Sequence, residues 1–63
     1  MEKNTLWVTK HRNSGNVTLD LHGWEVIKSL GAVDFETARK EAYLMLWSGK
    51  YKELRHIKGR VVS

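Results

Sequence analysis

The clearest pattern of apolar positions lies in the middle of the chain, over Asp34–Gly49. Its apolar residues recur at i, i+4, i+7 and i+8, which is the stripe that a helix packs against a core. They are Ala38, Ala42, Met45 and Leu46. Asp34 or Thr37 can cap the start by accepting a hydrogen bond from a free backbone N–H. Gly49 can end the helix because glycine takes the left-handed conformation without strain. The pattern therefore predicts a helix over Asp34–Gly49.

Two stretches before this helix alternate in the manner of strands. Thr5–Arg12 and Val17–Leu21 are rich in β-branched and aromatic residues and flank a run of turn-forming residues, which predicts a hairpin. A two-residue loop at 14–15 would set Val8 opposite Leu21. One face then carries Leu6, Val8, Val17, Leu19 and Leu21. The other face carries Trp7, Thr9, His11, Thr18 and Asp20.

A second tight turn at 22–23 predicts a third strand over Trp24–Lys28. Its cross-strand pairs would be Leu21 with Trp24, Leu19 with Val26, and Asp20 with Glu25. Trp24 and Val26 are thus expected to join the apolar face and the core. The pairing of two carboxylates is unfavourable. Ser29–Gly31 is expected to end the strand.

The C-terminal segment has two interpretations. Tyr51–Ile57 is predicted to be a last strand, ended by a turn at 58–59, with Arg60–Val62 continuing beyond it. The alternative is one longer helix, since a 3/4 spacing links Leu44, Trp47, Tyr51, Leu54, Lys58 and Val61. An interior Gly49 costs that helix roughly 1 kcal/mol, so the strand is preferred. The predicted fold is α+β and a single domain over 1–63: an antiparallel three-stranded meander, one helix packed across it, and a C-terminal strand.

Five short motifs carry a resemblance: Gly23-Trp24-x-Val26, Phe35-x-Thr37, Glu41-Ala42, Leu54-x-His56 and Gly59-Arg60-Val61. In these the chain resembles a family of short bacterial and phage domains of unknown function. The resemblance implies a last strand at 51–57 and supplies no catalytic residue or ligand. A fainter likeness, in three strands, one helix and a basic balance, is to the arm-binding domains of phage integrases. Those place the outer sheet face in DNA, whereas here that face would carry Asp20 and Glu25.

Charge is concentrated at the C-terminal end. The net charge is +4, and between positions 50 and 60 five cations stand against Glu53 alone, a local charge of +4. Such a cluster attracts nucleic acid or an acidic protein surface, although ordinary solubilising charge looks the same. The predicted nucleic-acid-binding residues are Lys50, Lys52, Arg55, His56, Lys58 and Arg60. In this hypothesis the domain is a small accessory or regulatory protein.

Aromatic residues support a second hypothesis, a protein-interaction module such as a small inhibitor or a homodimer. Trp7 falls on the outer face of the sheet, and Tyr43 and Trp47 lie one turn apart on the helix, away from its alanine stripe. They either cover the sheet edge and the last strand or form an exposed patch. An exposed patch would suit protein binding, or stacking on unpaired bases.

Other chemistry is poorly supported. His11, His22 and His56 lack the spacing that brings two imidazoles onto one cation, no glycine loop cradles phosphate, and no cleft is indicated for a carboxylate pair. We expect neither an enzyme nor a metal or other cofactor. No apolar run approaches the roughly 20 residues that span a bilayer, and the start MEKNTLWV has no apolar signal core. With no cysteine in the chain, a cytoplasmic location is expected.

Overall fold

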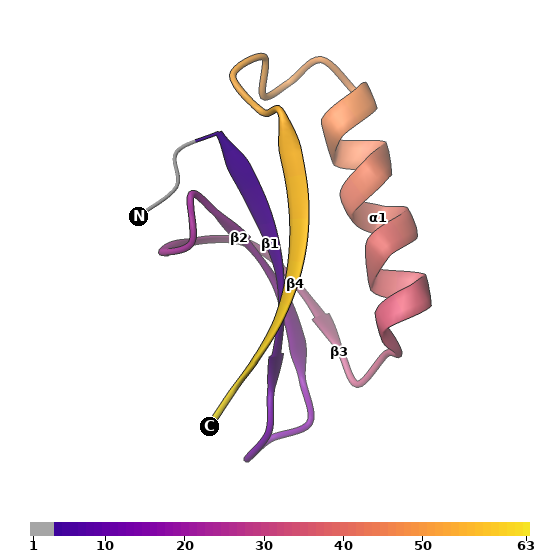
Figure 1. Cartoon of the computed structure of the whole chain (residues 1–63). Coiled ribbons are helices and arrows are strands. Elements are labelled where there is room, and N and C mark those ends of the chain that lie inside the picture. The colour runs from indigo at the N-terminus through magenta and orange to yellow at the C-terminus, as the bar shows by residue number, and fades with distance from the viewer. Residues whose placement is uncertain (1–3) are drawn as a thin grey trace.

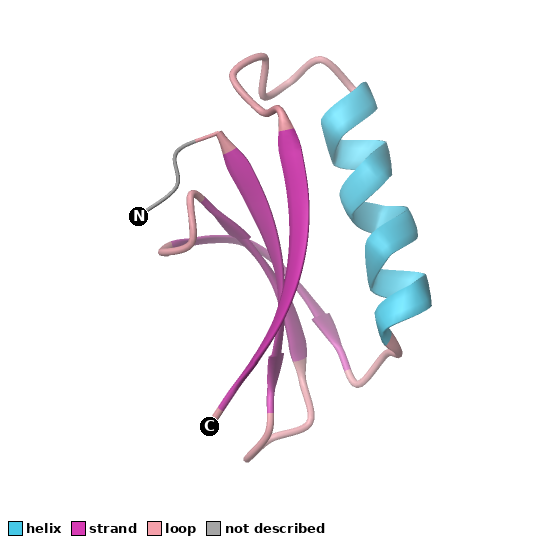
Figure 2. Ribbon diagram, in the orientation of Figure 1, coloured by secondary structure: helices cyan, strands magenta, loops and turns pink. Residues whose placement is uncertain are grey.

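The computed structural model describes residues 4–63. The prediction that the N-terminus has no apolar signal core rests partly on residues 1–3, which lie outside the described residues. Figure 1 shows four strands and one helix: β1 (Thr5–His11), β2 (Val17–Leu21), β3 (Glu25–Gly31), α1 (Phe35–Trp47) and β4 (His56–Val62). The strands form one sheet in the order β3-β2-β1-β4. α1 covers one face of this sheet, and within residues 4–63 no helix covers the other (Figure 2). The α+β class and the meander of β1–β3 are confirmed.

The first hairpin has the predicted faces but a different register. Leu6, not Val8, faces Leu21, so every pair is displaced by two positions. The loop is longer than two residues, because His11 N–H donates to Asn16 O at 2.8 Å and Gly15 N–H donates to His11 O at 2.7 Å. Side chains alternate with a period of two, so a shift of two leaves each on its original face.

The prediction for the second hairpin was wrong by one residue. Its loop takes three residues, with His22 at φ 60° and Gly23 at φ 92°, so Glu25 and not Trp24 faces Leu21. An odd shift moves side chains to the opposite face. Trp24 is therefore 65% exposed instead of lying in the core.

An irregularity in β2–β3 pairing moves the next residues too. Asp20 faces Val26, and Leu19 faces Lys28. The predicted pairing of Asp20 with Glu25 does not occur, and Val26 is exposed instead of joining the core. The strand also continues through the segment 29–31 that was expected to end it.

Local signals at both ends of α1 explain its length. The Asp34 carboxylate caps the first turn by accepting the Thr37 N–H at 2.8 Å. Hydrogen bonds from the side chain and then the backbone of Thr37 hold the pKa of Asp34 below its ordinary value of 3.8. At the other end Ser48 is the C-cap, and Gly49 follows at φ 78°. The predicted helix is confirmed within two residues at each end.

The core lies between α1 and the covered face of the sheet. Ala38 and Ala42 are fully buried, and their short side chains let the helix backbone approach the strands. The buried apolar residues are Leu6, Val8, Val17, Leu19, Leu21, Ala38, Ala42 and Leu54. Met45 and Leu46 pack against this cluster while staying partly exposed. The helix stripe and the apolar sheet face predicted from the sequence are both confirmed.

The predicted bounds of the last strand, Tyr51–Ile57, were wrong, because β4 spans His56–Val62. Residues 51–55 form the end of a loop, in which Leu54 is buried, and the strand follows beside β1, parallel to it. Gly59 is not a turn residue but the middle of β4, where the Phe35 ring lies 3.6 Å from the place a Cβ would occupy. A parallel partner requires a crossover connection, which α1 and its two loops provide.

Candidate functional site

The open face of the sheet, which no helix covers, gains its cations from β4. In the ladder between β1 and β4, Lys58 is the partner of Trp7 and Arg60 is the partner of Thr9. Paired residues in a ladder project to the same side, so Lys58 and Arg60 stand beside the polar side chains of β1. His56 precedes them on the same side of the strand. Half of the predicted nucleic-acid-binding set is therefore brought together on this face.

Trp7 is half-buried between these cations. Lys58 Nζ lies 5.9 Å and Arg60 Cζ 5.0 Å from the centroid of its ring, both within cation–π range. The indole Nε1 is buried and has no hydrogen-bond partner among residues 4–63. The Trp7 ring therefore packs beneath the two cations and makes a cation–π contact with each.

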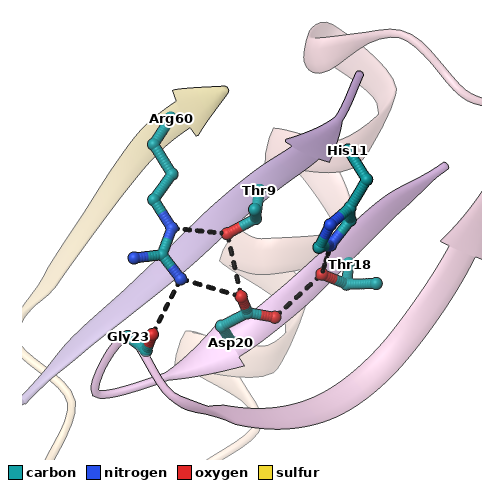
Figure 3. A network of polar contacts seen from close by, with 6 residues as sticks. All are labelled: Thr9, His11, Thr18, Asp20, Gly23 and Arg60. Carbon is teal, nitrogen blue, oxygen red and sulfur yellow. Dashed lines mark hydrogen bonds and ion pairs between the residues drawn. The ribbon is translucent and has the colours of Figure 1, made fainter. Parts of the chain in front are cut away.

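Arg60 is held by a network of polar contacts that crosses three strands (Figure 3). Its Nη2 donates to Asp20 Oδ2 at 2.9 Å and to the Gly23 carbonyl at 2.7 Å, while its Nε donates to Thr9 Oγ1 at 2.8 Å. Thr9 Oγ1 in turn donates to Asp20 Oδ2 at 2.9 Å. Asp20 is buried and its negative charge is matched by Arg60, so little of that charge is felt in solvent. The guanidinium of Arg60 is thus engaged in contacts within the fold.

The same network fixes a proton on His11. Thr18 Oγ1 donates to Asp20 Oδ1 at 2.8 Å, which uses the only proton of that hydroxyl. His11 Nε2 lies 2.9 Å from Thr18 Oγ1, which can then only accept. His11 therefore carries its proton on Nε2, and Asp20 receives hydrogen bonds from Thr9, Thr18 and Arg60.

The other three predicted cations lie in the loop between α1 and β4. Lys50, Lys52 and Arg55 are all exposed there. Arg55 Nη1 donates to the carbonyls of Lys52 at 2.8 Å and Leu54 at 3.0 Å, which ties its guanidinium to the loop backbone. The loop runs directly into β4, so these three cations precede the cations of that strand in the chain.

Negative charge is scarcer on the open face than the sequence indicated. Glu25 faces Leu21, whose side chain is buried under α1, so Glu25 belongs to the covered face. Asp20 remains on the open face but is paired with Arg60 at 2.9 Å. The objection drawn from these two acids to a nucleic-acid surface therefore loses its basis.

The aromatic residues of the alternative site do not form one surface. Trp7 lies on the open face, whereas Tyr43 and Trp47 lie on α1, beyond the other face of the sheet. On the helix the two rings contact each other, with centroids 5.4 Å apart, and both are exposed. They form an exposed aromatic pair on α1, with Trp47 the more exposed of the two.

Sequence reasoning missed the polar network and the exposure of Trp24. The alternation of Thr9, Thr18 and Asp20 on one face was visible, but their cation is 40 residues or more away in the chain. The histidines lie apart: His22 Nδ1 accepts the Asn4 N–H at 2.9 Å, near Trp24, and His11 is bound within the network.

Residues 4–63 contain no group of three or more metal-ligating side chains and no pocket. The one helix in this part of the chain is too short and too polar to cross a membrane. No family model, no curated protein and no solved structure matches the chain. The resemblance to the short domains of unknown function therefore stays a prediction.

Proposed function

We propose that this domain binds nucleic acid through the open face of its sheet and the loop that leads into β4. One observation carries the proposal: β4 lies beside β1, so Lys58 stands next to Trp7 on a face that no helix covers. An uncovered sheet face with an aromatic residue and cations can hold both the bases and the phosphates of a strand.

The loop before β4 supplies the phosphate contacts in this proposal. Asp20 matches the charge of Arg60, so the positive field comes from the exposed loop cations Lys50, Lys52 and Arg55. Each phosphate neutralised releases counterions, which lowers the slope of log affinity against log salt by about 0.7 for single strands. Three engaged cations give a slope of roughly −2, and binding that is micromolar or weaker at physiological salt.

Trp24 makes single-stranded nucleic acid the favoured ligand class. It follows Gly23, whose carbonyl accepts from Arg60, so it stands at the border of the open face. Its side chain is 65% exposed, and His22 lies nearby with ring centroids 6.5 Å apart. An exposed indole stacks on an unpaired base but has no comparable partner in an intact duplex.

A titration of the isotope-labelled domain with a short single strand and the matching duplex tests the proposal. We expect chemical-shift changes over 50–60 and around Trp24, with tighter binding of the single strand. Lys52→Ala with Arg55→Ala should flatten the salt slope by about 1.4. Trp24→Ala should weaken single-strand binding about fivefold or more, since stacking on one base contributes about 1–3 kcal/mol.

A matched control removes two cations from the covered side of the molecule. Lys28→Ala with Arg39→Ala changes the net charge by the same amount, and should leave the slope nearly unchanged. Equal losses in the two double variants would mean that only the net charge matters, and that no surface is selective. A low-salt titration without shifts on the open face would rule out this function.

A further inference from the structure

α1 has a second apolar stripe that the core does not use. Tyr43, Leu44 and Trp47 lie within about 100° of one another around the helix axis, on the side opposite Ala38 and Ala42. Leu44 is 61% and Trp47 73% exposed, and Tyr43 is 36% exposed. A soluble helix usually carries polar residues at such positions, so this stripe needs a partner.

The polar part of the same side shows which partner fits. Towards the N-terminus the exposed positions become charged, with Glu36 in the first turn and Lys40 one turn before Leu44. Beyond the C-terminal end the loop carries the exposed cation Lys50, whose Nζ lies 5.7 Å from the centroid of the Tyr51 ring. Along the helix the order is therefore an acid, a cation and the aromatic patch, and the loop that follows adds a second cation.

We propose that α1 pairs with α1 of a second copy of this chain, antiparallel, about a two-fold axis between Tyr43 and Leu44. Lys40 of each copy then faces Trp47 of the other, where its ammonium can lie over the indole ring. Glu36 of each copy reaches the end of the other helix, near Lys50. The helix dipoles oppose each other in this arrangement, which adds a small favourable term.

The size of the stripe indicates a weak, reversible dimer. Its three apolar side chains expose roughly 300–400 Å² in each copy, given that aromatic side chains bury 150–250 Å² each. Two copies together fall below the roughly 1,200 Å² of the smallest stable interfaces. We expect a dissociation constant on the order of 0.1 mM. α1 and the open face lie on opposite sides of the sheet (Figure 2), so pairing through α1 leaves the open face of each copy uncovered, and Lys50 is the one residue that this inference shares with the nucleic-acid proposal.

Sedimentation equilibrium of the full chain, without nucleic acid and across concentrations on both sides of that value, tests the pairing. Trp47→Ala should weaken dimerisation at least about tenfold, as expected for a central aromatic contact. Trp24→Ala is the matched control, because it removes a tryptophan of similar exposure from the other side of the sheet. A chain that stays monomeric at all concentrations overturns the proposal, as does a dimer that Trp47→Ala leaves unchanged.

A charge exchange tests the antiparallel orientation. Glu36→Lys places two cations together at each end of the pair, and Lys50→Glu places two acids there, so each change alone should weaken dimerisation severalfold. The double variant restores opposite charges and should recover the wild-type constant. Both positions are exposed, so folding should be retained in all three variants. Failure of the double variant to recover would exclude this orientation.

Discussion

The two faces of the sheet are built on different principles from the same strands. On the covered face, Leu6, Val8 and Leu19 pack beneath α1 with no polar group among them. On the open face, Asp20 collects hydrogen bonds from three neighbours without a helix above it. Burial of apolar surface needs complementary shape, whereas the open face needs particular donors and acceptors. The difference predicts distinct responses to substitution on the two faces.

The largest effect is expected on the covered face. Ala42→Asp would place an unpaired carboxylate where the side chain is fully buried, and should destabilise the fold by several kcal/mol. A domain of this size has little stability to lose, so we expect it to unfold at room temperature. Circular dichroism gives the measurement. Retention of the wild-type melting temperature would mean that the helix does not pack through Ala42.

On the open face the comparable change is Asp20→Ala. It leaves the Arg60 guanidinium half-buried without its carboxylate, and should cost roughly 2–3 kcal/mol, less than a fully buried pair because Arg60 is partly in solvent. The free energy of unfolding in urea gives the value. Asp20→Ala combined with Arg60→Met removes both charges and should cost less than the two single changes added together. Simple additivity in this cycle would show that the pair is not coupled.

A third change sharpens the description of the covered face. Gly59→Ala adds a Cβ 3.6 Å from the Phe35 ring, an ordinary van der Waals contact, at a position without positive φ. Glycine weakens a strand interior, so the alanine should stabilise the domain by about 0.5–1 kcal/mol. Gly59→Val, with two more methyl groups towards Phe35, should lose that gain. Thermal melts of the two variants distinguish a mid-strand position from the turn that the sequence favoured.

The smallest effect concerns the N-cap of α1. The pKa of Asp34 is lowered in the folded chain, so its stabilisation is complete above its ordinary pKa of 3.8 and is lost as the pH falls below it. Asp34→Asn keeps a capping oxygen but does not titrate. The melting temperature of the wild type relative to this variant should therefore decrease between about pH 5 and pH 2.5. A difference independent of pH would show that the carboxylate is not charged in its role as cap.

The sequence was sufficient wherever a signal was local. Period-two alternation assigned Leu6 and Val8 to the core correctly even though the register was displaced, because the displacement was even. Asp34 and Gly49 marked the ends of the helix for chemical reasons that need no tertiary contact. One additional loop residue, in contrast, was enough to move Trp24 from the predicted core to solvent.

Long-range features of the site could not be predicted in this way. The charge on Arg60 looked free until β4 was placed beside β1 and Asp20 came within 2.9 Å. Gly59 resembled a turn residue in the sequence. The Phe35 ring that packs over this position of the strand lies 24 positions earlier in the chain, so the sequence around Gly59 does not reveal it. The cations of the segment 50–60 were correctly seen as a cluster in sequence, but the fold divides them between a loop and a strand.

The parallel pairing of β1 with β4 has a consequence for how the chain acquires its structure. Arg60 bonds Thr9 across a separation of 51 residues, and closing so large a loop must precede the interactions that reward it. During synthesis, the first strand therefore leaves the ribosome well before its edge partner exists. Until β4 arrives, β1 presents an unpaired edge and Asp20 lacks its cation. The sheet is therefore completed late, when β4, the last strand to be synthesised, pairs with β1, the first.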